Sequence, residues 1–431
     1  MKDQYDNLIT TTSPGARDHY VDAVDRLLAG QAGIVDGFEK AVEADPGFAL
    51  GYAGLARGCQ FSGDMAGAKA AMAKAEDLAK AGTAREQSHI NAFSLLIAGK
   101  SGAAYAAIRA HVDDHPRDAL VAQTCSSVFG LIGFSGQPGR EAEILAYTAA
   151  LLPHYGEDWW CLSQYAFALC ENGVQDKASA IIDRSLDMNP HNANGAHVRS
   201  HIYYEIGEEA LGLGYLVDWL KPYDRGGYLH GHLSWHAALW SLEQGDLDTM
   251  WSRIDTDVKP GVAKGLPINV LTDTASILYR AELAGVPVPK ERWIDISTYA
   301  TRFFPKSALG FVDVHVALAH AMAGNTEALT GLVAAPNGLT GDLVAPIAQS
   351  YGAIARENWS EAVSLLTSAM ADHARLGGSR AQRDLLEFSL LGALLKLGKD
   401  DEAKRLLMLR RPALANTKAV HGLNAHQGVI A

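Results

Sequence analysis

Apolar residues recur along the chain every three or four positions, which is the spacing of one face of an α-helix. The clearest stretch runs from Leu162 to Pro190, where one apolar run is followed by a turn glycine, Gly173, and then by a second run. Small residues such as Ala178 in the second run allow two antiparallel helices to approach closely. The pattern therefore predicts two helices that meet at Gly173.

The same unit recurs along much of the chain. An earlier copy begins at Leu50 and turns at Gly63, and later turn glycines are Gly207 and Gly245. The spacings are 34 residues from Gly173 to Gly207 and 38 residues from there to Gly245. A helix–turn–helix unit that repeats at about 34 residues is typical of the tetratricopeptide repeat. We predict an all-α fold, a strongly curved solenoid of tetratricopeptide-like helix pairs.

The repeat weakens over residues 258–345, where prolines and irregular connections interrupt it, although helices are still expected there. Regular pairs return with turns near Asn358 and Gly398. No alternation typical of β-strands is present. The predicted organisation is one continuous solenoid with N-terminal helix pairs (1–157), a repeat region that holds a pocket (158–412) and a C-terminal tail (413–431).

Charge and cysteine content exclude several classes of function. The formal net charge is -12, so nucleic acid and anionic membrane surfaces are not expected as partners. No apolar run approaches the roughly 18 residues that span a bilayer, and no apolar signal core begins the sequence, so we expect a cytoplasmic protein. The four cysteines form no CxxC pair, and we expect buried free thiols.

Several short sequence motifs are more specific than the general repeat pattern and indicate a particular family. They are Asn189-Pro190 followed by His197 and His201, the run from His232 to Leu239, Asp273 with Leu278-Tyr279-Arg280, Asp313-Val314-His315, and the run from Gly377 to Asp384. In these strings, from about residue 158 to 411, the chain resembles the tetratricopeptide repeat protein 38 family. The resemblance implies the helical-repeat fold and a shared polar set, which is His197, His201, His232, His236, Asp273, Asp313, His315, Gln382, Arg383 and Asp384. The chain departs from the family at Tyr203, where relatives often carry another histidine.

Two pairs of histidines stand out within this set. His197 and His201 are four residues apart on one predicted first helix, and His232 and His236 are four apart on the first helix of the next pair. Side chains at this spacing share a helix face. Counted from the turn glycine that follows each helix, all four fall on the side that lines the groove. Three polar residues on later inner helices are predicted to join them as catalytic residues: Asp273, Asp313 and His315.

Such a cluster is compatible with two kinds of chemistry. In the first, the four histidines bind a divalent metal ion and an aspartate completes the ligand shell; the HExxH pattern of zinc proteases is absent. In the second, a metal-free site uses histidine as general acid and base, and Arg383 binds a substrate carboxylate. The residues predicted to contact the substrate are Arg383, Gln382, Asp384, Trp235 and Tyr203.

The function predicted from these residues is an enzyme that acts on a small, anionic organic substrate in a pocket lined by His, Asp and Arg. The alternative is an adaptor that binds peptides without catalysis, which is a common role of tetratricopeptide arrays. A homodimeric scaffold is a third hypothesis, and the histidines could also be plain hydrogen-bonded contacts between repeats. Adaptor grooves often present Lys, Arg and Asn, whereas the inner residues here are mostly His, Asp and Trp.

Overall fold

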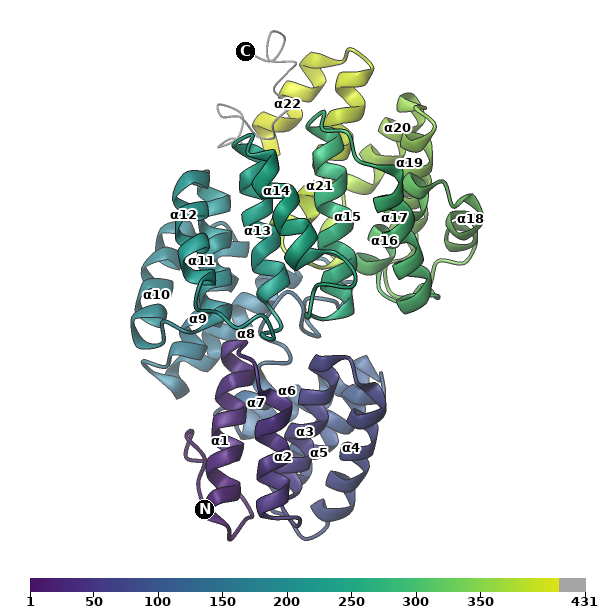
Figure 1. Cartoon of the computed structure of the whole chain (residues 1–431). Coiled ribbons are helices and arrows are strands. Elements are labelled where there is room, and N and C mark those ends of the chain that lie inside the picture. The colour runs from purple at the N-terminus through teal and green to yellow at the C-terminus, as the bar shows by residue number, and fades with distance from the viewer. Residues whose placement is uncertain (411–431) are drawn as a thin grey trace.

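The computed structural model describes residues 1–410, and they form an all-α solenoid of helix pairs. The first seven helices form an N-terminal block at one end of the molecule, coloured purple to blue in Figure 1. Each long helix of the block packs against the next one along the chain. The block consists of α1 (Pro14–Ala29), α2 (Ile34–Ala44), α3 (Ala49–Ser62), α4 (Met65–Ala79), α5 (Ala84–Ile97), α6 (Ser101–Asp114) and α7 (Ala119–Ala122).

The next seven helices confirm the repeat expected from the turn glycines. Helices α9 and α10 meet at Gly173, α11 and α12 at Gly207, and α13 and α14 at Gly245. The three glycines have φ angles of 80°, 74° and 77°, a left-handed conformation that residues with a Cβ rarely adopt. The bounds are α8 (Arg140–Tyr155), α9 (Trp159–Glu171), α10 (Gln175–Met188), α11 (Ala193–Ile206), α12 (Glu209–Leu220), α13 (His230–Glu243) and α14 (Leu247–Arg253).

The remaining helices include the stretch in which the repeat weakens. A π-helix (Ile254–Val258) and the short helix α18 interrupt the regular pairs there, whereas the two later pairs turn at Asn358 and near Gly398 as expected. The bounds are α15 (Pro267–Leu283), α16 (Lys290–Phe303), α17 (Gly310–Ala323), α18 (Thr326–Ala334), α19 (Gly341–Ala355), α20 (Trp359–Met370), a 3-10 helix (His373–Leu376), α21 (Arg380–Lys396) and α22 (Asp400–Arg410).

Contacts between distant parts of the sequence close the curved array. Helix α21 packs against α11 and α15. Arg140, the first residue of α8, donates hydrogen bonds to the carbonyl oxygens of Ala374 (2.6 Å) and Gly378 (2.7 Å), which precede α21. Arg383 of α21 forms an ion pair with Glu141 at 2.8 Å. The helices from α8 to α21 therefore form a closed turn of the solenoid.

The end of α1 docks the N-terminal block onto this closed turn. Asn194 of α11 donates a hydrogen bond to the carbonyl of Leu28 (2.8 Å), and the hydroxyl of Tyr223 donates to the carbonyl of Gly30. These contacts span more than 160 residues of sequence. Space that would be an open groove in an extended array is therefore covered on one side by the N-terminal block.

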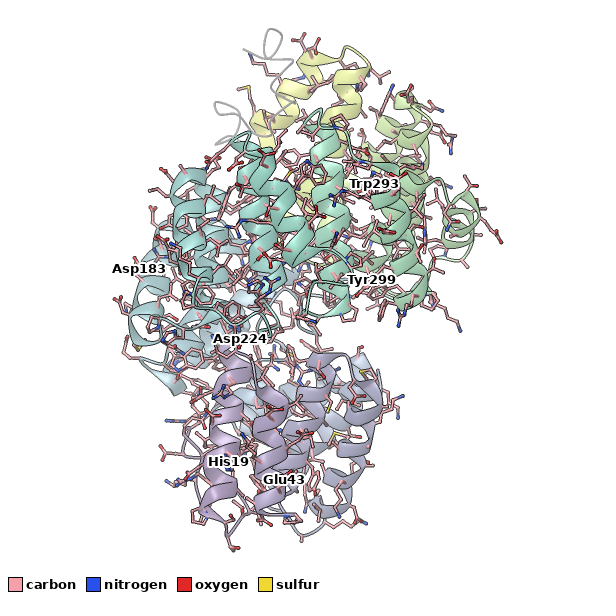
Figure 2. The ribbon with its side chains drawn as sticks, viewed as in Figure 1. His19, Glu43, Asp183, Asp224, Trp293 and Tyr299 are labelled. Atoms are coloured by element: carbon pink, nitrogen blue, oxygen red, sulfur yellow. The ribbon has the colours of Figure 1, made fainter. Side chains whose placement is uncertain are left out.

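The outer surface carries most of the charged side chains, and exposed polar residues such as His19, Glu43, Asp183 and Asp224 are labelled in Figure 2.

Inside, the four cysteines are buried and unpaired, which confirms the prediction of free thiols; they are Cys59, Cys125, Cys161 and Cys170. Among residues 1–410, β-structure is limited to one antiparallel bridge between Lys2 and Leu8. The predicted tail, 413–431, lies outside the described residues.

No helix among the described residues has both the length and the apolar character needed to cross a membrane.

Close helix packing gives a first testable prediction. A Cβ built on Gly54 of α3 would lie 2.2 Å from the ring of Phe38 in α2. We expect Gly54→Ala to destabilise the protein by about 1–3 kcal/mol, because the Phe38 ring is fully buried and would have to shift to make room for the methyl group. Gly102→Ala in α6 is the matched control, since its Cβ would meet no atom within 4 Å. Chemical denaturation of both variants measures the difference, and equal stability would contradict the packing argument.

Candidate metal centre

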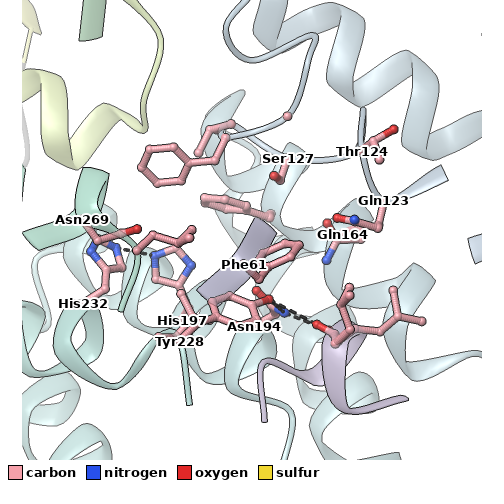
Figure 3. A pocket seen from close by; sticks show the side chains of 18 of the residues that line it. Phe61, Gln123, Thr124, Ser127, Gln164, Asn194, His197, Tyr228, His232 and Asn269 are labelled. Atoms are coloured by element: carbon pink, nitrogen blue, oxygen red, sulfur yellow. Dashed lines mark hydrogen bonds between the residues drawn. The ribbon is translucent and has the colours of Figure 1, made fainter. Parts of the chain in front are cut away.

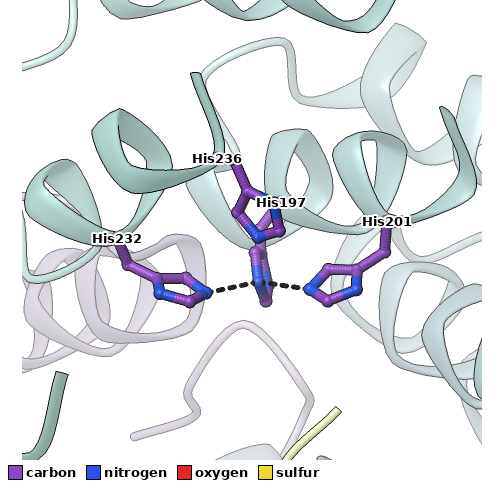
Figure 4. A group of neighbouring side chains, drawn as sticks. All are labelled: His197, His201, His232 and His236. Atoms are coloured by element: carbon purple, nitrogen blue, oxygen red, sulfur yellow. Dashed lines mark hydrogen bonds between the residues drawn. The ribbon is translucent and has the colours of Figure 1, made fainter. Parts of the chain in front are cut away.

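Four histidine side chains converge between α11 and α13 (Figure 4). The Nε2 atom of His197 lies 3.0 Å from Nε2 of His232 and 2.8 Å from Nε2 of His201. His236 completes the group, with its ring centroid 4.8 Å from that of His201. One ring nitrogen from each of the four lies within 4.8 Å of the others. The structure thus brings together all four predicted histidines.

Their helical spacing explains this convergence. His197 and His201 share a face of α11, and His232 and His236 share a face of α13, because residues four apart lie one above the other on a helix. Exposed fractions range from 6% for His197 to 0% for His201. The imidazoles are therefore buried between the two helices, and the ring nitrogens of His236 have no hydrogen-bond partner.

Burial also sets the charge of the cluster. Burial, together with the nearby His232, lowers the pKa of His201 to about 3. Burial and the neighbouring imidazoles lower the pKa of His197 and of His236 well below the usual value for histidine. These three imidazoles are thus neutral near pH 7, which is the protonation state of a metal-binding histidine.

Two residues outside the cluster orient its members. His232 Nδ1 lies 2.8 Å from Oδ2 of Asp273 on α15, so that the imidazole can donate there and direct its Nε2 lone pair at the centre. Burial raises the pKa of Asp273, and the contact with His232 offsets part of that rise. Trp235 stacks against the His232 ring at 5.2 Å between centroids and 17° between planes. The orientation of His232 is consequently fixed on two sides.

The spacing of the nitrogens suits a single ion. Zinc–imidazole bonds are about 2.0–2.1 Å long, so two nitrogens on one ion are about 3–4 Å apart, depending on the coordination geometry. The two contacts at His197 are 2.8 and 3.0 Å, and all four nitrogens lie within 4.8 Å. The two pairs at His197 are thus slightly closer than two ligands of one ion, and side-chain movements would be needed to place all four nitrogens around it.

A chamber of about 310 Å³ adjoins the cluster. His197 and His232 lie at one end of it, and Gln123, Gln164 and Thr124 lie at the other (Figure 3). Most of the remaining wall is apolar, and it comes from both the N-terminal block and the closed turn; it includes Phe61, Phe129, Phe134, Val128, Trp160 and Leu229. The arrangement is an apolar cavity with a few polar groups and two imidazoles at one end, as small-molecule sites usually are.

The other predicted catalytic residues are not part of this centre. Asp313 accepts hydrogen bonds from the Ser307 hydroxyl (2.7 Å) and from the backbone N–H of Ala308 (3.2 Å), just before α17. His315 lies 2.7 Å, at Nδ1, from the carbonyl oxygen of Phe311. Neither residue belongs to the four-histidine cluster or lines the chamber.

The residues predicted to contact substrate do not line the chamber either. Arg383 pairs with Glu141, Gln382 forms a capping box with Ser379 at the start of α21, and Asp384 accepts a 2.8 Å hydrogen bond from the Tyr204 hydroxyl. The start of α21 contacts the start of α8, where the two ends of the closed turn meet. Arg383 contributes directly to that contact. Tyr203 packs beside Arg199. Trp235 contacts the rings of His232 and His236 but does not line the chamber.

Sequence reasoning missed several residues around the chamber. Arg57 lies six residues before Gly63, the same offset that separates His201 from Gly207. Likewise, Asn194 precedes Gly207 by thirteen residues, as His232 precedes its own turn glycine. Applying the same offsets to every repeat would have found both. No comparable signal marks the loop residues Gln123 and Thr124.

A second buried group in the N-terminal block contains His89, His111 and Asp118. Both histidines contact Oδ2 of Asp118, at 3.0 and 3.2 Å, and Arg85 pairs with the same oxygen at 2.5 Å. Since an arginine already neutralises this carboxylate, the group is a buried hydrogen-bonded network rather than a cation site.

Comparison with known proteins does not identify a family, and no family model matches the chain. Among solved structures, the chain is similar to yeast Tom70, with 15% identity over 95% of this chain and 86% of that one and a TM-score of 0.35. It is also similar to the TPR domain of P58(IPK), with 15% identity over 90% of this chain and 99% of that one and a TM-score of 0.22. A third similar structure is Naa15/Naa10 bound to HypK-THB, with 12% identity over 96% of this chain and 73% of that one and a TM-score of 0.24. At these low values the comparisons assign the chain neither a partner nor an activity.

Proposed function

We propose that the four histidines bind one divalent transition-metal ion, and that the protein is an enzyme that uses this ion on a small organic molecule in the adjoining chamber. The observation that carries the proposal is the convergence of four buried ring nitrogens from two helices beside a cavity. Buried polar groups normally have hydrogen-bond partners, yet both nitrogens of His236 lack one. A bound ion would give the cluster the partner it lacks.

The protonation states favour the metal hypothesis over metal-free acid–base catalysis. A general acid near neutral pH needs a pKa close to the working pH, whereas burial lowers the pKa of His201 to about 3 and lowers the pKa of His197 well below the usual value for histidine. Neutral imidazoles cannot donate the proton that such a mechanism requires of a histidinium. They retain the lone pairs that a metal ion needs.

Each side of the centre has a distinct part in this proposal. His201 and His236 lie away from the chamber and would anchor the ion, while His197 and His232 line the chamber. Asp273 would hold the His232 ring in the ligating tautomer. An ion held by all four histidines would have no open position in a four-coordinate shell. A substrate or water oxygen would therefore have to join as a fifth ligand from the side of His197 and His232, where the ion would supply Lewis-acid polarisation.

Membership of the tetratricopeptide repeat protein 38-like family is part of this proposal. It is supported by the position of the strings that carry the resemblance, because those around His197, His232 and Asp273 meet at one centre. A cytoplasmic location and a homodimer stay predictions.

The second candidate function is the peptide-binding adaptor, which the fold by itself favours. Stacked helix pairs create concave surfaces that seat extended segments. The observation on this chain that supports it is a wider groove of about 890 Å³, whose lining includes Tyr105, Phe134, Gly338 and Arg375. A protein that binds peptides but no metal would replace the enzyme hypothesis with this one.

Metal titration tests the proposal directly. Protein treated with a chelator and then dialysed against Zn²⁺, Co²⁺ or Ni²⁺ is expected to hold one ion per chain, measured by elemental analysis. The visible spectrum of the cobalt form reports nitrogen coordination and its geometry. Binding should also stabilise the folded state, by about 2.7 kcal/mol at a free metal concentration 100 times Kd. Metal content far below one ion per chain with every metal would overturn the proposal.

A further inference from the structure

Arg57 of α3 is a buried cation without an acidic partner among the described residues. Its exposed fraction is 8%. Nη1 donates a hydrogen bond to Oε1 of Gln60, and Nε has no partner. The guanidinium carbon lies 4.7 Å from the ring centroid of Phe61 and 5.7 Å from that of Phe93. Burial lowers the pKa of Arg57 to about 10, so the side chain is still charged near pH 7.

Other buried arginines of this chain have more oxygen partners than Arg57, although Nε of Arg280 and Nε of Arg383 also lack one. Arg140 donates to three backbone carbonyls and to a carboxylate, and Arg280 donates to one carbonyl at 2.6 Å. Arg383 pairs with Glu141. A buried charge without such compensation costs several kcal/mol. Arg57 therefore retains donor capacity that a ligand can use.

Arg57 lies in the wall of two cavities, so a ligand there can reach its guanidinium group. Arg57 lines both the chamber beside the histidines and the wider groove, and the two share Thr124, Phe129 and Phe134 as walls. It thus lies at the junction through which a molecule from the groove would reach the centre. It is also the only lysine or arginine among the described residues that line the chamber.

We infer that Arg57 binds the carboxylate of a small organic monoacid whose apolar body occupies the chamber. This inference rests on the proposed function for its biological meaning, because it names the class of molecule that the metal centre would meet. A guanidinium presents two parallel N–H groups that match a carboxylate. The aromatic rings of Phe61, Phe129 and Phe134 provide the surface for the apolar body.

Size and charge narrow the ligand class. A volume of about 310 Å³ lies at the lower end of the range of about 300–1,000 Å³ that is usual for small-molecule sites, which suits a small acid. A phosphate ester carries close to two negative charges at neutral pH and would be only half neutralised by one arginine. The net charge of -12 adds to that penalty. A monocarboxylate is the better match.

Benzoate and benzamide are suitable probes, because they share a shape and differ in charge. Calorimetric titration of the chelator-treated protein is expected to show benzoate binding in the millimolar range or tighter, with benzamide at least about ten times weaker. Arg57→Gln should weaken benzoate binding by about tenfold or more, while Arg57→Lys retains part of it. The matched control is Arg109→Gln, whose guanidinium lies 5.3 Å from the ring of Tyr147 but does not line the chamber.

Several results would overturn the inference. They are a lack of benzoate binding by the wild-type protein, equal binding of benzoate and benzamide, and unchanged benzoate affinity in a folded Arg57→Gln variant. Circular dichroism of each variant establishes folding. Because the titration uses metal-free protein, benzoate binding without metal binding would refute the metal centre alone. Metal binding without any preference for benzoate would refute the anion site alone.

Discussion

Replacing His201 or His236 with alanine is expected to remove most of the metal affinity while leaving the fold intact. Each substitution deletes one of four ligands, so affinity for Zn²⁺ should fall by more than the roughly 10–100-fold that loss of an orienting partner costs. Both imidazoles are buried, and His201 Nδ1 also lies 3.9 Å from Oε1 of Glu171. Each alanine therefore leaves a cavity, and the metal-free variants should melt somewhat below the metal-free wild type. Competition titration with a chromophoric chelator and thermal melting measure the two effects.

Two further variants sharpen this test. His19→Ala removes an exposed histidine of α1 and should leave zinc affinity unchanged. Asp273→Asn keeps the shape beside His232 but weakens its orientation, and it should give an intermediate loss of about 10–100-fold. If His201→Ala and His236→Ala both lower the melting temperature by several degrees without changing metal affinity, the histidines are structural and the adaptor hypothesis replaces the enzyme.

Arg140→Met is expected to cause the largest loss of stability among the variants considered, about 3 kcal/mol or more. The Arg140 side chain is fully buried and donates to the carbonyl oxygens of Ala374, Gly378 and Gly133. Methionine fills similar space but leaves these buried acceptors without a donor, at about 1–3 kcal/mol each. Denaturant titration gives the free energy of unfolding, and hydrogen exchange should show lost protection at the start of α21.

The control is a surface ion pair of similar chemistry. Arg184 and Glu157 pair on the outside with half or more of each side chain exposed, and such pairs contribute about 1 kcal/mol or less. Arg184→Met should therefore be nearly neutral. A similar small effect for Arg140→Met, with unchanged exchange at α21, would mean that other contacts close the solenoid.

Much of the fold could be predicted because its determinants are local. Gly173, Gly207 and Gly245 end helices at positions that need a positive φ, and the period between them identifies the repeat unit. The four histidines could be predicted for the same reason, since a spacing of four residues fixes a shared helix face. Arg57 was missed, although it occupies the offset of His201 in an earlier repeat.

The sequence by itself therefore determined the regular helix pairs and the inward face of the helices that carry the four histidines, which depend on residues fewer than about 40 positions apart. Only the tertiary structure decided how far the array curves. Arg140 and Arg383 join α8 to α21 across more than 230 residues, and in that closure Arg383 pairs with Glu141 and does not line the chamber. Small rotations between successive repeats add up along a solenoid, so whether distant side chains meet depends on every interface between them. Local spacing places His197 and His232 on inner helices, but the docking of the N-terminal block encloses the chamber beside them.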